Sequence, residues 1–271
     1  MALRVNTNTF SLNAQKNLSV IGEKLGGSFA KLSSGLRIVT AADDAAGLGI
    51  SERMRAQVRS LDMAGRNTQD GVSLVQTAEG AMGEISSNLV RMRELAVEAA
   101  NGTLSTADRT SLNDEFAALL SEIDRVSTQT EFNGTSLLDA AATIAIQVGT
   151  DTGQTIDIST ADMQTTALGI NASTITNVTT ASAALGLLDT AITTVVDQRG
   201  NFGAIQNRLS SAMRSIQTTS ENLSGAESRI RDVDVAKETA ELTKNRIMQQ
   251  AAASILAQAN SQPQLALSLL G

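Results

Sequence analysis

Residues 188–233 read LDTAITTVVDQRGNFGAIQNRLSSAMRSIQTTSENLSGAESRIRDV, and every seventh position, counted from the first, is apolar. The members of this row are Leu188, Val195, Phe202, Leu209, Ile216, Leu223 and Ile230. A second row, from Ala191 to Val233, is mostly small or apolar. A sustained seven-residue repeat is typical of a long amphipathic helix that packs as in a coiled coil. We therefore expect a helix over about 182–234, with a hinge at Lys237, where the repeat fails.

Three further helices are predicted in the first half of the chain. Apolar residues follow each other by three or four positions from Leu18 to Leu36, and again from Ile50 to Ala96. The second of these stripes indicates a helix over about 48–100, which at 1.5 Å per residue would be roughly 80 Å long. A third helix is expected over 105–129, because Ser105 and Asp108 form the pattern of a capping box.

The centre of the chain has a different pattern. TIAIQVG (143–149) and QTIDIST (154–160) alternate apolar and polar residues, and the turn-forming segment TDTG separates them. This arrangement predicts a β-hairpin over about 143–160.

Together these elements predict a mainly α fold. We expect an elongated multi-helix rod with coiled-coil packing of the N- and C-terminal helices, plus a small β-hairpin region. Residues 1–42 and 235–271 would form a terminal coiled-coil core domain, and residues 43–234 an outer rod domain.

The composition argues against catalysis. The chain has no His, Cys, Trp or Tyr, so the commonest acid–base group at neutral pH and the commonest metal ligands are missing. Asp43 and Asp44 form the one acidic pair that suggests a metal or acid–base role, and we interpret them as residues of a helix start. We expect no enzyme activity, no cofactor and no metal.

The charge distribution argues against a nucleic-acid partner. Residues 1–40 have a formal charge of +4 and residues 226–271 of 0, whereas residues 41–225 have −11. No cleavable signal peptide and no membrane-spanning segment is expected, since no apolar run is long enough.

Both ends of the chain are apolar, and no residue from Ile247 to Gly271 is charged. A hairpin of two such helices would expose more apolar surface than a soluble monomer tolerates. We therefore expect other copies of the same chain to cover these ends. The residues expected to pack between subunits are Leu18, Ile21, Leu25, Phe29, Leu32, Ile247, Ile255, Leu256, Leu265, Leu267, Leu269 and Leu270.

Several long blocks of this sequence, together covering about 1–140 and 182–271, resemble bacterial flagellin. They are LNAQKNL (12–18), KLSSGLRIVTAADDAAGLGISERM (31–54), RMRELAVEAANGTLS (91–105), EIDRVSTQTEFNGTSLLD (122–139) and RIRDVDVAKETAELTKNRIMQQAAASILAQANSQPQLALSLLG (229–271). The chain departs from many flagellins in having little between 140 and 180, where others carry large variable outer domains. It also has RIVTAADDAAG where Asn-Ser is expected after the Ile.

The resemblance implies a structural subunit of the bacterial flagellar filament, a self-assembling helical homopolymer for motility. It implies secretion by the flagellar type III export apparatus, escort by a flagellin chaperone, and neighbours among the hook-associated junction and cap proteins. The alternatives are a hook–filament junction protein of the same superfamily, an enzyme with a carboxylate site on a helical rod, and a coiled-coil adaptor that does not polymerise.

The resemblance also implies a contact with the vertebrate innate receptor TLR5 (Toll-like receptor 5). Arg91 and Leu95 match the basic and apolar positions of the receptor-contacting motif, and Glu115 matches its acidic position. The simpler interpretation is that Arg91 and Glu115 form an exposed ion pair and that Leu95 belongs to the core.

Overall fold

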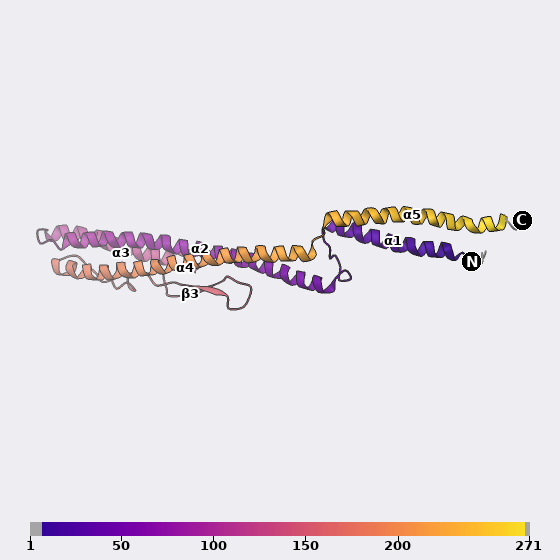
Figure 1. Ribbon diagram of the computed structural model, residues 1–271. Coiled ribbons are helices and arrows are strands. Elements are labelled where there is room, and N and C mark those ends of the chain that lie inside the picture. The colour runs from indigo at the N-terminus through magenta and orange to yellow at the C-terminus, as the bar shows by residue number, and fades with distance from the viewer. Residues whose placement is uncertain (1–6, 269–271) are drawn as a thin grey trace. The chain divides into compact units, whose positions relative to one another are not determined.

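The computed structural model describes residues 7–268, and the side chains of residues 7–261 (Figure 1). Over this part the chain is mainly helical, as predicted. The helices are α1 (Thr9–Ser34), α2 (Ala45–Ala99), α3 (Thr106–Gln129), α4 (Val178–Arg231) and α5 (Val235–Ser268). The strands are β1 (Glu131–Phe132), β2 (Thr135–Ser136), β3 (Thr143–Gln147) and β4 (Thr155–Ser159).

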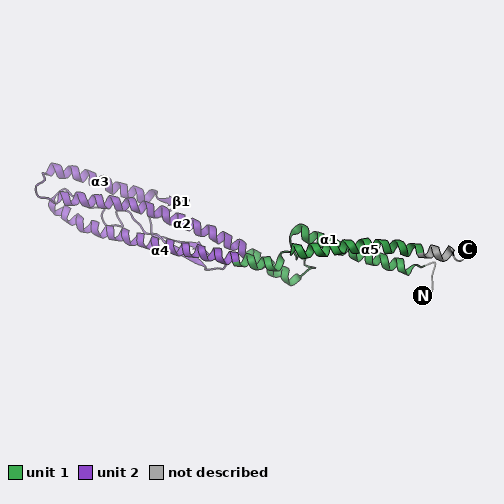
Figure 2. Cartoon of the chain, turned by 45° about the horizontal axis from the view of Figure 1, so that its top comes forward, with its two compact units in different colours: residues 1–56, 222–271 green, residues 57–221 purple. Residues whose placement is uncertain are grey.

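The chain divides into two compact units, coloured separately in Figure 2. Unit 1 comprises residues 1–56 and 222–271, and unit 2 comprises residues 57–221. The long helices α2 and α4 each contribute residues to both units.

Unit 2 has a continuous apolar core between α2, α3 and α4 (Figure 1). The first five members of the seven-residue row on α4, from Leu188 to Ile216, are buried, which confirms the predicted apolar face of this helix. The row on α2 is buried from Val75 to Ala96, whereas Ile50 at its start is exposed, and Phe116 and Ile123 of α3 complete the core. The fully buried members on α2 include Met82, Ile85, Leu89, Met92 and Leu95.

The predicted hairpin is present and lies against α2 and α4. Strands β3 and β4 pair antiparallel with Thr143 opposite Ser159. Ile146 of β3 lies so close to Gly71 of α2 that a Cβ there would be 3.2 Å from Ile146 Cγ1. The side-chain amide of Gln198 on α4 donates to the carbonyl oxygen of Ser159 over 2.8 Å. The small residue on α2 thus allows the hairpin to pack closely.

Helix α3 is fixed at its start by the expected capping box. The Ser105 side chain accepts a bond from the Asp108 backbone N–H, and the Asp108 side chain accepts one from the Ser105 backbone. The Ser105 hydroxyl also donates to Asp108 Oδ2 over 2.7 Å. This side-chain bond is the largest cause that lowers the pKa of Asp108, and the bond from the Ser105 backbone N–H lowers it further. Arg109 is buried and donates to the carbonyl oxygens of Ala99 (2.9 Å) and Asn101 (2.8 Å), so it caps the end of α2.

In unit 1, α1 and α5 lie side by side and antiparallel (Figure 1). Helix α1 ends at Gly35, whose φ of 72° is the left-handed conformation that favours glycine. The predicted hinge at Lys237 is wrong, because α4 already ends at Arg231 and α5 begins at Val235. Lys237 instead lies in the first turn of α5, where its backbone N–H is bound by the side chain of Asp234.

Of the described residues, only those of α4 are apolar enough over a sufficient length to cross a membrane. This criterion for a membrane-spanning helix considers length and composition alone, and core helices of soluble proteins also meet it. The row from Leu188 to Ile216 on this helix is buried within unit 2, but only 28% of the most apolar window of α4 is buried.

Truncation of a buried residue of α2 should destabilise the chain far more than truncation of an exposed one. Leu95 is 0 % exposed and Val97 is 51 % exposed on the same helix. We expect Leu95→Ala to lower the free energy of unfolding by about 2–5 kcal/mol, because it removes packed atoms and leaves a cavity. The matched control Val97→Ala should change it by about 0.5 kcal/mol or less. Urea denaturation of the two variants tests this, and equal losses would contradict the described core.

Candidate assembly surface

Many of the buried residues of α1 and α5 have small side chains, although Leu242 and Asn245 of α5 are buried as well. Ala14 and Ser28 of α1 are buried, as are Ala252 and Ala259 of α5. Two polar bonds hold the far end of the contact between α1 and α5. The Asn8 side-chain amide donates to the carbonyl oxygen of Ala259 over 2.8 Å, and the Ser11 hydroxyl donates to Asn260 Oδ1 over 2.7 Å. Small residues allow two helices to approach closely, but they bury little apolar area.

The structure divides the predicted subunit-packing residues into two groups. Five are partly buried and share a helix face with the buried residues of the α1–α5 contact: Leu18, Ile21, Leu25, Leu32 and Leu256. Three are exposed: Phe29 (44 %), Ile247 (61 %) and Ile255 (58 %). The side chains of Leu265 and Leu267, and the whole of Leu269 and Leu270, lie outside the described residues.

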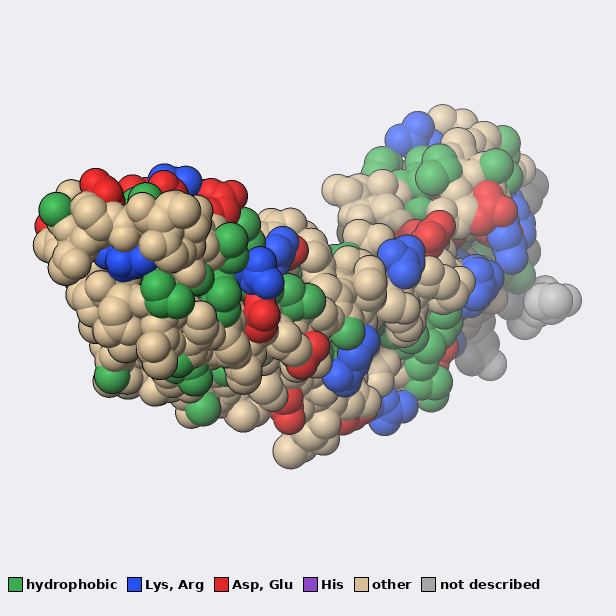
Figure 3. Space-filling view, turned by 90° about the vertical axis from the view of Figure 1, so that its left-hand side faces the viewer, with side chains coloured by type: hydrophobic (Ala, Val, Ile, Leu, Met, Phe, Trp, Pro, Cys, Tyr) green, Lys and Arg blue, Asp and Glu red, His purple; other side chains and the backbone are tan. Residues whose placement is uncertain are grey.

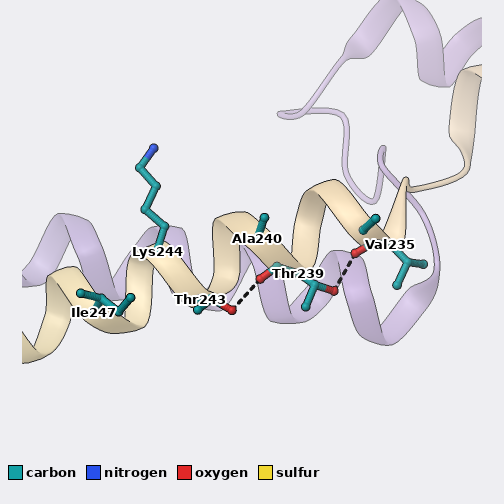
Figure 4. A pocket seen from close by; sticks show the side chains of 7 residues that line it. Val235, Thr239, Ala240, Thr243, Lys244 and Ile247 are labelled. Atoms are coloured by element: carbon teal, nitrogen blue, oxygen red, sulfur yellow. Dashed lines mark hydrogen bonds between the residues drawn. The ribbon is translucent and has the colours of Figure 1, made fainter.

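Helix α5 has a second apolar face, turned away from α1. The residues of this face lie on an open groove, shown in Figure 4. Thr239 and Thr243 donate their hydroxyls to the backbone oxygens of Val235 (2.6 Å) and Thr239 (2.9 Å). Because these hydroxyls are satisfied, the threonine methyl groups join Val235 and Ile247 in a mainly apolar surface, in which Lys244 is the one charged residue. We use the name outward face of α5 for this surface from Val235 to Ile247, together with the exposed Ile255, which lies two turns further along the helix and outside the groove.

Some exposed apolar residues of unit 1 were missed by the sequence analysis. Phe10, Leu12 and Val20 of α1 and Val235 of α5 are all exposed. They fall outside the main stripe of three- and four-residue spacing, which predicts one apolar face per helix. A search for a second, weaker stripe on the same helices would have found them. Phe29 has one local partner, the guanidinium of Arg246, which lies 5.2 Å from the ring centre.

Of the three residues expected at a receptor contact, Arg91 and Glu115 are brought together on the surface of unit 2. Arg91 Nε donates to Glu115 Oε1 over 2.9 Å, and Arg91 Nη1 to Glu94 Oε2 over 3.0 Å. These hydrogen bonds raise the pKa of Arg91, and the bond to Glu115 is the largest cause. Leu95 is fully buried, so its side chain supports this surface from beneath.

On the face of the molecule shown in Figure 3, acidic and basic side chains are interspersed with small groups of hydrophobic ones.

The acidic pair serves the start of α2, as the sequence analysis interpreted it. Asp44 Oδ1 accepts a bond from the Gly47 backbone N–H over 2.9 Å, which caps the helix. Asp43 Oδ2 accepts bonds from the backbone N–H groups of Thr40 and Val39. The Thr40 bond is the largest cause that lowers the pKa of Asp43. Among the described residues, no three acidic side chains are grouped so that they could hold a metal ion.

Comparisons with known proteins match almost the whole chain. The family model described as the bacterial flagellin N-terminal helical region matches residues 5–143, and that of the C-terminal helical region matches residues 185–270. A flagellin of Halalkalibacterium halodurans is 47% identical over 98% of this chain and 99% of its own length. The flagellin of Bacillus subtilis is 44% identical over 99% of this chain and 100% of its own.

A solved structure of a flagellin also matches this chain. The crystal structure of Bacillus cereus flagellin is 38% identical, with a TM-score of 0.52, and covers 60% of this chain and 94% of its own. A flagellar hook-associated protein from Vibrio parahaemolyticus reaches a TM-score of 0.60 at 13% identity, which shows a shared fold alone. The sequence matches therefore favour flagellin over the junction-protein alternative. The chain belongs to the bacterial flagellin family and is a short-form structural subunit of the flagellar filament, not an enzyme.

Proposed function

We propose that this subunit polymerises by mutual burial of its terminal helices. The observation that supports the proposal is the outward face of α5, where Ile247 and Ile255 are each more than half exposed. A helix that is apolar on opposite sides is stable in water only when both sides are covered. Helix α1 covers one side within the chain. Neighbouring copies of the chain cover the other.

The energetics of this burial suit a polymer. Full burial of a side chain such as Ile247 stabilises by about 1.5–3 kcal/mol. One such contact cannot offset the loss of translational and rotational freedom on association. Each subunit, however, would bury Phe29, Ile247 and Ile255 together with their counterparts on its neighbours. Because the same contact is repeated along a helical tube, the total free energy of association is favourable.

The two parts of the chain have different roles in this proposal. Residues 1–42 and 235–271 form the coiled-coil core domain of the filament, and residues 43–234 form its outer rod domain. The continuous apolar core of unit 2 supports this division, because it is formed within the unit, although Val97 and Val196 remain exposed on its surface. The residues that pack subunits are those predicted in the terminal helices, with Phe10, Leu12 and Val20 added from their exposure.

A charge on the outward face of α5 tests the assembly proposal. Ile247→Asp should leave the helix content and melting temperature of the free chain unchanged, since the position is 61 % exposed there. It should prevent polymerisation, because an unpaired carboxylate would have to be buried between subunits. Seeding with sonicated filament fragments, followed by sedimentation, measures this.

The control at the same position is Ile247→Val, which keeps an apolar side chain and should still appear in the pellet. Sedimentation of Ile247→Asp to the wild-type extent would remove the proposal. It would favour instead assembly through unit 2 alone.

We further propose an extracellular location and the partners that flagellin-like subunits use on the way there. The chain is secreted through the flagellar type III export apparatus, escorted by a flagellin chaperone, and incorporated next to the hook-associated junction and cap proteins. The apolar terminal helices support the need for an escort, because they expose Ile247 and Ile255 until assembly covers them.

A second candidate function is recognition by the host receptor TLR5. The exposed Arg91–Glu115 pair on α2 and α3 favours it, because the pair presents a basic and an acidic group side by side. Leu95 contributes from the core by holding α2 in place beneath Arg91.

Receptor signalling by the free chain tests this function. Arg91→Ala should abolish it, because the variant removes both the cation and its hydrogen bonds to Glu115 and Glu94. The matched control is Arg125→Ala, which removes another exposed arginine of unit 2 that pairs with Glu122 within α3. A reporter-cell assay in which Arg91→Ala signals as strongly as Arg125→Ala would exclude the contact.

A further inference from the structure

The break between α4 and α5 occurs where the sequence has neither glycine nor proline, although Asp234 provides an N-cap for α5. Residues 229–238 read RIRDVDVAKE, and glycine and proline are the residues that commonly end helices. One row of seven-residue spacing even continues across the break, through Ala226, Val233, Ala240 and Ile247. The local sequence is therefore compatible with one helix that would join α4 to α5.

The connector between α1 and α2 supplies the hydrogen bonds that replace those of a continuous helix. In such a helix the N–H groups of residues 233–235 would bind the carbonyl oxygens of residues 229–231. Instead, the N–H of Val233 donates to the carbonyl oxygen of Gly35 over 3.0 Å. The backbone N–H of Arg37 donates to the carbonyl oxygen of Arg231 over 2.6 Å. The guanidinium of Arg37 donates to the carbonyl oxygen of Ile230, with Nε at 3.2 Å.

Other contacts hold the same junction from its two sides. Leu36 and Asp232 form an antiparallel bridge between the connector and the break. Arg231 is 12 % exposed at its side chain and donates to Glu52 Oε1 over 2.8 Å. Asp234 Oδ1 accepts a bond from the Lys237 backbone N–H over 3.1 Å and so caps α5. Residues almost 200 positions apart in the chain thus fix where α4 ends.

We propose that this break is conditional and that Arg37 is the residue that holds it open. When the connector is released, residues 232–234 close into helix, and α4 and α5 run on as one. The two states exchange helical hydrogen bonds at residues 233–235 for hydrogen bonds to the connector. Because similar numbers of backbone groups are bonded in each state, the two states are close in free energy, as a two-state element requires. In the joined state the row from Ala226 to Ile247 becomes continuous. In the joined state, α5 is held by its backbone hydrogen bonds to α4. In the broken state, it is held by its contacts with α1 and the connector.

The state of the junction can be measured residue by residue in the full-length free chain, whether or not it polymerises. In Arg37→Ala we expect the ¹³Cα chemical shifts of residues 232–234 to move to helical values. The amide of Asp234 should also exchange about tenfold more slowly, because it gains a helical hydrogen bond. Both Arg37→Ala and Arg37→Lys keep the backbone bond to Arg231. Arg37→Lys also keeps a cation that can donate to the carbonyl oxygen of Ile230, so it should show the same changes to a smaller extent. The lysine variant keeps the test decisive should Arg37→Ala fail to fold.

Two controls separate this proposal from a general loss of structure. Arg229→Ala removes an exposed arginine close to the junction and should leave the break as it is. Val233→Pro added to Arg37→Ala should restore the break, because proline cannot occupy a helix interior. Non-helical shifts at residues 232–234 in Arg37→Ala, whether with wild-type or faster exchange, would overturn the proposal. Such a result would mean that the local sequence alone ends α4.

Discussion

Helix α5 is apolar on two opposite sides, and α1 can cover only one of them. This single constraint explains where small and large apolar residues lie on the terminal helices. The covered side contains small residues such as Ala252 and Ala259, which let α1 approach closely. The uncovered side contains Ile247 and Ile255, and its threonines turn their hydroxyls back to the helix backbone. A surface of this kind is costly in water and stable only against another apolar surface.

The two units differ in how much of their apolar surface they bury without a neighbouring subunit. In unit 2 the row of α4 from Leu188 to Ile216 and the row of α2 from Val75 to Ala96 are buried, and α3 with the hairpin closes the core. Residues 57–221 have nine basic and nineteen acidic side chains, a formal charge of −10, whereas the rest of the chain has +3. Copies of unit 2 therefore repel each other, an effect that salt screens. In the proposed assembly, attraction between subunits comes largely from the terminal helices, which expose Ile247 and Ile255, although unit 2 also exposes Met63 and Val196.

The sequence predicts most of the fold because most of it is local. The row from Leu188 to Ile216 and the capping box at Ser105 were recognised from short-range patterns, and the structure confirms them. The hinge predicted at Lys237 is wrong, because the position of the break depends on hydrogen bonds with Gly35 and Arg37, far away in sequence. The terminal residues were identified as apolar, but their division into covered and exposed groups depends on which side α1 occupies. Spacing along one helix does not contain that information.

The central claim is that the outward face of α5 is buried by other copies of the chain. Hydroxyl-radical footprinting with mass spectrometry tests it most directly, because it compares side-chain exposure in the free and polymerised states. We predict that Ile247 and Ile255 are oxidised readily in the free chain and about tenfold less in sedimented filaments, as burial between subunits requires. The buried Leu242 should react little in both states. Equal oxidation of Ile247 and Ile255 in free chain and filament would contradict the claim.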